Sequence, residues 1–122
     1  MLKGNIRGGS SLRLEERYAG EMMGKPLEGI GFVGYDNFRG RYQIIWLDNS
    51  STAVFTGFGN YDADQKALIF PVQMDDPGTG EKDKLSVYVY RMISPDQRVF
   101  EMYEGDEVAP EKKMSVMIYE RR

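Results

Sequence analysis

Apolar and polar residues alternate over short runs along this chain, and clusters of turn-forming residues separate the runs. The plainest case is the stretch around residues 36–41 (DNFRGR), where aspartate, asparagine and glycine favour a tight turn between two strand-like runs. Pairing Tyr35 with Tyr42 across this turn also places Gly31 opposite Trp46. Directly opposite residues of a hairpin share one face. This face is therefore apolar, and the glycine leaves space for the only tryptophan ring of the chain.

The same apolar face continues onto the next strands. A second turn, in which Asp48 pairs with Ser51, puts Phe55 on this face. A third turn, in which Tyr61 pairs with Leu68, extends the face to a further strand. These registers place four aromatic residues inside: Tyr42, Trp46, Phe55 and Phe70.

One charged residue interrupts an otherwise apolar face near the N-terminus. Residues 11–19 (SLRLEERYA) alternate as a strand does, and Glu16 falls on the apolar side. If the following turn pairs Glu21 with Pro26, Glu16 lies opposite Gly31 and close to the tryptophan. A loop one residue longer or shorter would exchange the two faces of this strand.

Two long strands are predicted in the C-terminal half, at residues 84–93 and 98–104. Pairing Ile93 with Arg98 across the turn between them directs Arg91 toward the inside. The other inward residues in this register are Phe100 and Met102. The aromatic residues that it places outside are Tyr88, Tyr90 and Tyr103.

The spacing of these runs predicts an all-β fold of about eight strands, the last at residues 112–120. Sequential hairpins favour an antiparallel up-and-down meander, which removes its exposed edges by closing into a barrel. We expect a single β-barrel domain over residues 1–122, in which residues 1–10 form at most a short or frayed strand. Barrels of this size are filled by side chains or hold one small ligand.

Composition excludes several kinds of chemistry. The chain has no cysteine and no histidine, which excludes disulfides, thiolate catalysis, histidine-ligated haem and a serine–histidine triad. We expect no metal site and no cofactor. The net charge of −3 is interspersed without a basic stripe, so nucleic acid is not an expected partner. No apolar run approaches the roughly 18 residues of a membrane helix and no signal-peptide pattern is present, so we expect a cytoplasmic protein that does not bind membranes.

Several runs of the chain also resemble an uncharacterised bacterial family, domain of unknown function 1579. The runs are GIGFVGYDN (29–37), YQIIWLDN (42–49), GNYD (59–62), DDPGTG (75–80) and FEMYE (100–104). The resemblance covers roughly residues 11–120. It implies a lipocalin-like (calycin-type) barrel and supplies no activity, cofactor or catalytic residue. Members usually begin with a further strand carrying Gly-x-Trp-x-Gly, which this chain lacks, so its barrel could lack one N-terminal strand.

The predicted inward residues give the candidates for a ligand cavity. They are Glu16, Tyr42, Trp46, Phe55, Phe70, Arg91, Phe100 and Met102. Two of them, Glu16 and Arg91, are charged. They could anchor the polar head of a ligand, form a buried ion pair that closes one end of the barrel, or result from an error in the predicted register.

Three functions are compatible with such a barrel. The first choice is a non-catalytic binding protein for a small apolar molecule held in the cavity. The second is a structural or protein-interaction module whose barrel is filled by its own side chains. The third is an enzyme using carboxylate and tyrosine chemistry, which ranks last because the chain shows no recognisable paired-carboxylate motif.

The outward residues of the central hairpin predict an assembly. Four of them are large and apolar: Ile30, Phe32, Ile45 and Leu47. Exposed apolar patches are unusual in monomers, and a missing first strand would leave a barrel edge open to pairing. We therefore expect a homodimer that covers the apolar face, the open edge, or both. The alternative is that residues 1–10 fold over the gap and the chain stays monomeric.

Overall fold

The computed structural model describes residues 2–8 and 13–121, and within them only the backbone of residues 2–8, 13, 22 and 121. The described residues form nine strands and one turn of 3-10 helix, η1 (Pro110–Lys112). The strands are β1 (Leu2–Gly8), β2 (Arg13–Met22), β3 (Lys25–Asp36), β4 (Arg41–Asp48), β5 (Phe55–Asp62), β6 (Ala67–Asp76), β7 (Glu81–Ser94), β8 (Gln97–Glu104) and β9 (Lys113–Arg121). Among the described residues, no helix has the length and apolar character needed to cross a membrane.

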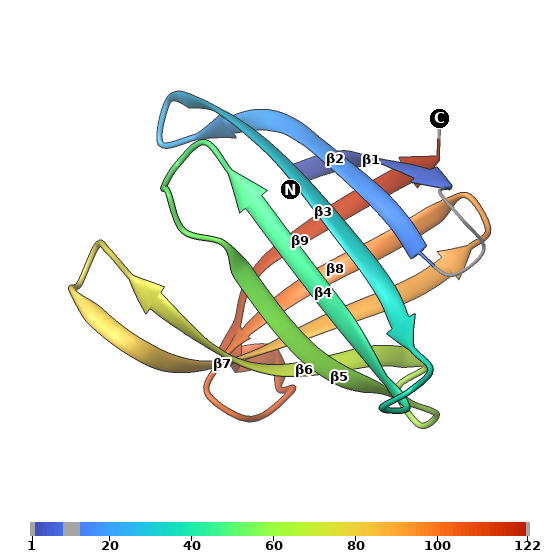
Figure 1. Cartoon of the computed structure of the whole chain (residues 1–122). Coiled ribbons are helices and arrows are strands. Elements are labelled where there is room, and N and C mark those ends of the chain that lie inside the picture. The colour runs from blue at the N-terminus through green and yellow to red at the C-terminus, as the bar shows by residue number, and fades with distance from the viewer. Residues whose placement is uncertain (1, 9–12, 122) are drawn as a thin grey trace.

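The strands wind around a barrel in chain order (Figure 1). From β2 to β9, eight strands each pair antiparallel with the next, which confirms the predicted all-β up-and-down meander. The strand β1 lies between the two ends of this meander, antiparallel to β2 and parallel to β9. The expected open edge between β2 and β9 is therefore absent from the described residues, because the N-terminal segment fills the gap.

Three predicted hairpin registers are confirmed, with Glu21 opposite Pro26, Tyr35 opposite Tyr42, and Tyr61 opposite Leu68. Turn chemistry explains why local sequence sufficed. In the β3–β4 turn, the Asp36 carboxylate accepts hydrogen bonds from the next backbone N–H groups, and Gly40 closes the turn with φ of +67°. In the β5–β6 turn, the carboxylate of Asp62 accepts hydrogen bonds from the backbone N–H groups of Asp64 and Gln65 in the same way.

The predicted β4–β5 register is wrong by two residues, because Trp46 pairs with Phe55 and not with Ala53. The connection is a longer loop than the tight turn that the sequence suggested. The side chain of Asn49 bonds back to β3, accepting the backbone N–H of Glu28 at 3.0 Å, which draws the chain away from a two-residue turn. An even shift preserves the face, so the aromatic side chains that the sequence placed inside remain inside.

The predicted β7–β8 register is wrong by one residue, which has a larger consequence. At the turn Ser94 pairs with Gln97, as expected, but an irregularity between Met92 and Ser94 makes Met92 the partner of Arg98. An extra residue on one strand exchanges the faces of everything beyond it. The β7 side chains predicted outside, Tyr88 and Tyr90, are therefore buried inside, and Arg91 lies outside.

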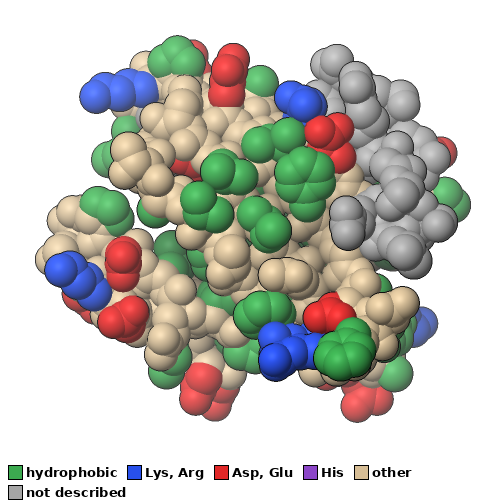
Figure 2. All heavy atoms as spheres, viewed as in Figure 1, with side chains coloured by type: hydrophobic (Ala, Val, Ile, Leu, Met, Phe, Trp, Pro, Cys, Tyr) green, Lys and Arg blue, Asp and Glu red, His purple; other side chains and the backbone are tan. Residues whose placement is uncertain are grey.

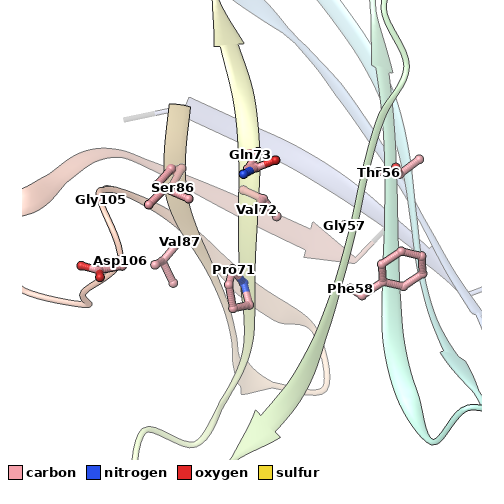
Figure 3. Close-up of a pocket in the computed structure, with 11 residues that line it drawn as sticks. Thr56, Gly57, Phe58, Pro71, Val72, Gln73, Ser86, Val87, Gly105 and Asp106 are labelled. Carbon is pink, nitrogen blue, oxygen red and sulfur yellow. The ribbon is translucent and has the colours of Figure 1, made fainter. Parts of the chain in front are cut away.

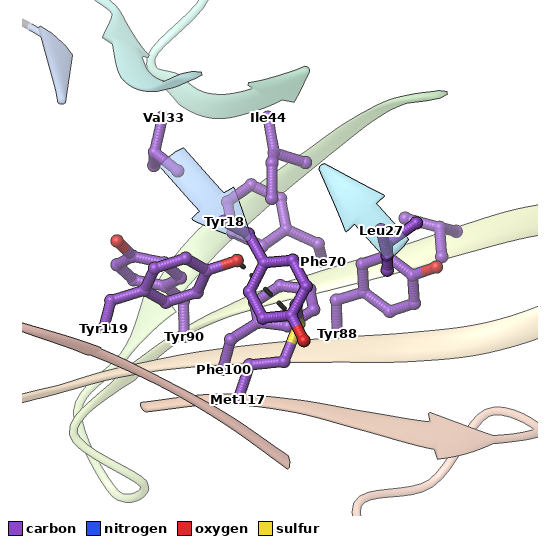
Figure 4. Close-up of a cluster of buried hydrophobic side chains, with 11 residues drawn as sticks. Tyr18, Leu27, Val33, Ile44, Phe70, Tyr88, Tyr90, Phe100, Met117 and Tyr119 are labelled. Carbon is purple, nitrogen blue, oxygen red and sulfur yellow. Dashed lines mark hydrogen bonds between the residues drawn. The ribbon is translucent and has the colours of Figure 1, made fainter. Parts of the chain in front are cut away.

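The barrel interior is aromatic and closely packed (Figure 4). Phe55 stacks on Tyr88 with 5.0 Å between ring centroids, and Tyr88 meets Phe100 edge-on at 5.1 Å. The fully buried side chains of this cluster include Phe70 from β6 and Tyr119 from β9. These contacts tie the C-terminal strands to β5 and β6.

A second apolar cluster lies on the outside of the barrel. It consists of Ala67, Val87, Val89 and Tyr103, packed against Ile69 and Val108. Val108 belongs to the connection between β8 and β9, which covers this face. Tyr103 points outward as predicted, but it is buried in this cluster and not exposed.

The outward apolar residues of β3 and β4 remain partly exposed. Ile30 pairs with Leu47, and Phe32 pairs with Ile45, so the four side chains form one patch. Figure 2 shows hydrophobic side chains gathered in the middle of this face of the molecule. We call these four residues the β3–β4 patch.

The packing of Trp46 gives a test of the central register. A Cβ atom at Gly31 would lie 2.8 Å from Cε3 of the Trp46 ring, closer than van der Waals contact permits. We predict that Gly31→Leu lowers the free energy of unfolding by about 1–3 kcal/mol, since the ring must move. Chemical denaturation, with Trp46 fluorescence as the signal, measures the change. Gly78→Leu, in an exposed turn, is the control, and equal midpoints for the two variants would contradict the packing.

Candidate functional site

The most unusual side chain of the barrel interior is Glu16. It lies on the inward face of β2, opposite Gly31 of β3, as the sequence predicts, and only 3% of its surface is exposed. A buried carboxyl needs a partner or must lose its charge. Burial raises the pKa of Glu16 to about 8, although the positive charge of Arg98 acts to lower it. At neutral pH the group is therefore mainly an uncharged carboxylic acid.

The residues around Glu16 come from strands far apart in the sequence. Arg98 on β8 lies directly opposite Tyr119 on β9, and both are buried. Burial raises the pKa of the Tyr119 hydroxyl, and negative charge on Glu16 or Tyr18 would raise it further. The charge of Arg98 acts on Glu16, and the charges of Glu16 and Tyr18 act on Tyr119. These side chains therefore lie near one another and form one site: Glu16, Tyr18, Arg98 and Tyr119. We call these four residues the interior polar cluster.

Two oxygen atoms of the interior have no hydrogen-bond partner among the described residues: Oε1 of Glu16 and the hydroxyl of Tyr90. Among the described residues, the hydroxyl of Tyr119 donates a long hydrogen bond to the sulfur of Met117, at 3.8 Å (Figure 4). Buried polar atoms are nearly always paired, since each unpaired one costs of the order of 1–3 kcal/mol. Unpaired oxygens inside a barrel indicate a place where a water molecule or a ligand atom binds.

The second charged candidate, Arg91, is not in this site. It lies on the outer face of β7, where its Nε–H donates to Glu101 at 2.7 Å and its Nη1–H donates to the backbone oxygen of Gln65 at 2.7 Å. Lys113 contacts the other carboxylate oxygen of Glu101 at 2.8 Å. Burial opposes the charge of Glu101, but the hydrogen bonds from Lys113 and Arg91 outweigh it and lower its pKa. These charges are therefore paired with one another on the outer face of the barrel.

The remaining predicted candidates all line the interior. Phe70 and Phe100 are buried in the core, and four further candidates pack against it while partly buried: Tyr42, Trp46, Phe55 and Met102. Sequence reasoning did not single out Arg98, although the predicted register already places it on the same face of β8 as Phe100. It missed Tyr90, because the irregularity at Ile93 exchanges the faces of β7.

A second feature is a seam in the barrel wall between β5 and β6. Among the described residues, these strands pair only from Asn60–Ile69 to Asp62–Ala67. Farther along, the side chain of Val72 fills the space beside Gly57, where a Cβ atom would lie 2.8 Å from Val72 Cγ1. Side-chain packing therefore replaces backbone pairing over this part of the wall.

A hollow of about 460 Å³ lies on the outer surface at the seam. Figure 3 shows β5 residues on one side of it and β6 residues on the other. Its lining residues are Thr56, Gly57, Phe58, Pro71, Val72, Gln73, Leu85, Ser86, Val87, Gly105 and Asp106. Val72 lines this hollow and also belongs to the interior core.

In the part of the chain that the structure describes, no three acidic side chains lie close enough together to hold a metal ion.

The raised pKa of Glu16 predicts how stability varies with pH. The uncharged form is favoured by folding, so its stabilising contribution is complete below the unfolded-state pKa and is lost as pH rises through about 8. Between the unfolded-state pKa and about 8, the free energy of unfolding of the parent should fall by up to about 1.4 kcal/mol per pH unit. We predict that Glu16→Gln abolishes this fall. Denaturant unfolding between about pH 5 and pH 9 measures it. Glu28→Gln, an exposed control, should behave like the parent, and parallel curves for all three proteins would contradict a buried neutral Glu16.

Comparison with known proteins places the chain in a family without a known activity. A family model described as a protein of unknown function (DUF1579) matches residues 7–121, so most of β1 precedes the match. No curated protein and no solved structure matches the chain. The match covers most of the barrel, from the end of β1 to the end of β9. The chain belongs to the DUF1579 family.

Proposed function

We propose that this protein is a non-catalytic binding protein for a small, mainly apolar molecule that enters the barrel at the β5–β6 seam. The observation that carries the proposal is the double position of Val72, which borders both the outer hollow and the interior core. Because β5 and β6 are held there by side chains rather than by ladder pairing, a rotation of one side chain opens a route inward. No backbone hydrogen bond of the described β5–β6 ladder has to break.

The interior has the composition of a pocket that can adapt to a ligand. Aromatic and aliphatic side chains dominate it, with a few polar groups, as in most small-molecule sites. Three methionines, Met74, Met102 and Met117, pack in or against this core. Methionine has an unbranched side chain with several rotatable bonds, so it can move aside at low cost when a ligand enters.

The architecture supports the same proposal. The eight-strand antiparallel meander from β2 to β9, which β1 closes into a barrel, is similar in form to the lipocalin-like barrels, which hold ligands inside. We assign this chain to that structural type as part of the proposal.

Binding and entry are tested together with Nile red, an uncharged apolar dye whose fluorescence rises in apolar surroundings. We predict saturable binding of one dye per chain, and several-fold faster association in Val72→Ala, because the smaller side chain opens the seam. Stopped-flow fluorescence measures the rates. Val116→Ala, on β9 away from the seam, is the control. A parent protein without saturable binding would contradict the function, and equal association rates in all three proteins would contradict entry at the seam.

The β3–β4 patch supports a second proposal, that the barrel also serves as an interaction module in a homodimer. Its four apolar side chains are contiguous and partly exposed. Pairing two copies through such a face would bury it by two-fold symmetry. Because β1 closes the edge, this proposal rests on the β3–β4 patch and not on an open strand edge.

Light scattering coupled to size exclusion at micromolar concentration tests the homodimer. We predict a mass near twice 14.0 kDa for the parent and near 14.0 kDa for Ile45→Glu, which places a charge in the centre of the patch. Met92→Glu, an exposed position on β7, should keep the parent mass. A parent mass near 14.0 kDa would rule out the dimer.

A further inference from the structure

The unpaired oxygens of the interior indicate which chemical group a ligand would carry. Only 3% of the surface of Glu16 is exposed, and its Oε1 has no hydrogen-bond partner among the described residues. The buried hydroxyl of Tyr90 is likewise unpaired. Both atoms belong to side chains on the inward face of the barrel.

Strand register places Tyr90 next to the interior polar cluster. Tyr90 on β7 lies opposite Phe100 on β8, and the next inward residue of β8 is Arg98. Arg98 lies opposite Tyr119, and negative charge on Glu16 would raise the pKa of the Tyr119 hydroxyl. Tyr90 is thus the diagonal cross-strand neighbour of Arg98 on the inward face. The charge of Arg98 acts on Glu16, and the charges of Glu16 and Tyr18 act on Tyr119. The cross-strand neighbour of Glu16 on β3 is Gly31, which has no side chain.

The cluster itself shows which charge it accepts. Desolvation keeps Glu16 mainly protonated at neutral pH even with Arg98 nearby, so a negative charge is disfavoured at this place. A carboxylate on a ligand would meet the same desolvation. A cationic head would meet the positive charge of Arg98. An uncharged polar group avoids both costs.

We propose that Glu16 and Tyr90 bind the hydroxyl group of a small, mainly apolar alcohol or phenol whose apolar body lies among the interior aromatic side chains. A hydroxyl fits both unpaired atoms, because its O–H donates to the Glu16 carboxyl oxygen and its oxygen accepts the Tyr90 O–H. An ether or ketone oxygen can accept from the Glu16 acid O–H or from Tyr90, but it cannot donate, so the carbonyl oxygen of the protonated Glu16 stays without a donor. This inference rests on the proposed function and specifies its ligand class.

The test compares two isomers of equal size, 1-octanol and methyl heptyl ether, as competitors of Nile red at pH 7. The first can donate a hydrogen bond and the second cannot, so the ratio of their dissociation constants isolates the hydroxyl. We expect 1-octanol to bind roughly tenfold more tightly than the ether, as hydrogen bonds to buried partners allow. Octanoate, with the same chain length and a charged head, should bind more weakly than 1-octanol.

Variants assign the preference to the two residues. In Glu16→Leu the ratio between the isomers should fall to near one, whereas Glu16→Gln, whose amide oxygen still accepts, should retain most of it. Tyr90→Phe removes only an unpaired hydroxyl, so it should fold and should reduce the ratio severalfold. Tyr103→Phe removes a hydroxyl from the outer cluster and should leave the ratio unchanged.

Each outcome has a distinct meaning. Equal affinities of the isomers for the parent, as expected if only water occupies the cluster, would overturn the hydroxyl site while leaving the proposed function intact. Tighter binding of octanoate, or a ratio unchanged in both Glu16→Leu and Tyr90→Phe, would also overturn it. Failure of Nile red and of every competitor to bind would defeat the proposed function itself.

Discussion

The alternation of side chains between the two faces of each strand is the constraint on which this barrel depends. In a closed sheet one face has no access to solvent, so every hairpin register decides which residues are buried. The contact of Trp46 with the glycines of β3 anchors this choice at the centre. The ring lies over Gly29 and Gly31, and its Nε1–H donates to Asp48 at 2.8 Å. A shift of β3 against β4 by one residue would remove the glycines from beneath the ring. It would also turn Gly31, the cross-strand neighbour of Glu16, toward the outside.

The same constraint explains what could be predicted from the sequence. Hairpins with turn residues capped by aspartate, such as the one around Asp36, have a register that local sequence determines. The β4–β5 loop shifted by two residues and still kept its face, so Phe55 was placed correctly from a wrong pairing. The irregularity at Ile93 has no comparable local signal. It exchanges the faces of β7, so that Arg91 lies outside and Tyr88 and Tyr90 lie inside. The interior position of these two tyrosines could therefore not be predicted from the sequence.

Two buried glutamates show how differently one side chain can be used in this fold. Glu101, on the outside, receives hydrogen bonds from Arg91 and Lys113, and these lower its pKa despite burial. Glu16, on the inside, has a raised pKa and an unpaired oxygen. The first arrangement joins β7, β8 and β9 through paired charges. The second costs stability, and such local costs are typical of functional positions rather than of structural ones. In the proposed function, the seam at Val72 would be the route of access to this interior, and the methionines of the core would move aside for a ligand.

The central claim is that an apolar molecule enters the barrel and that its hydroxyl meets Glu16. A crystal structure of the protein grown with 1-octanol tests this most directly. The account predicts the alkyl chain among the interior aromatic side chains, with the alcohol oxygen about 2.5–3.0 Å from the Glu16 carboxyl. An alcohol bound only in the outer hollow, or an interior filled by the protein's own side chains with Glu16 bonded to water alone, would contradict it.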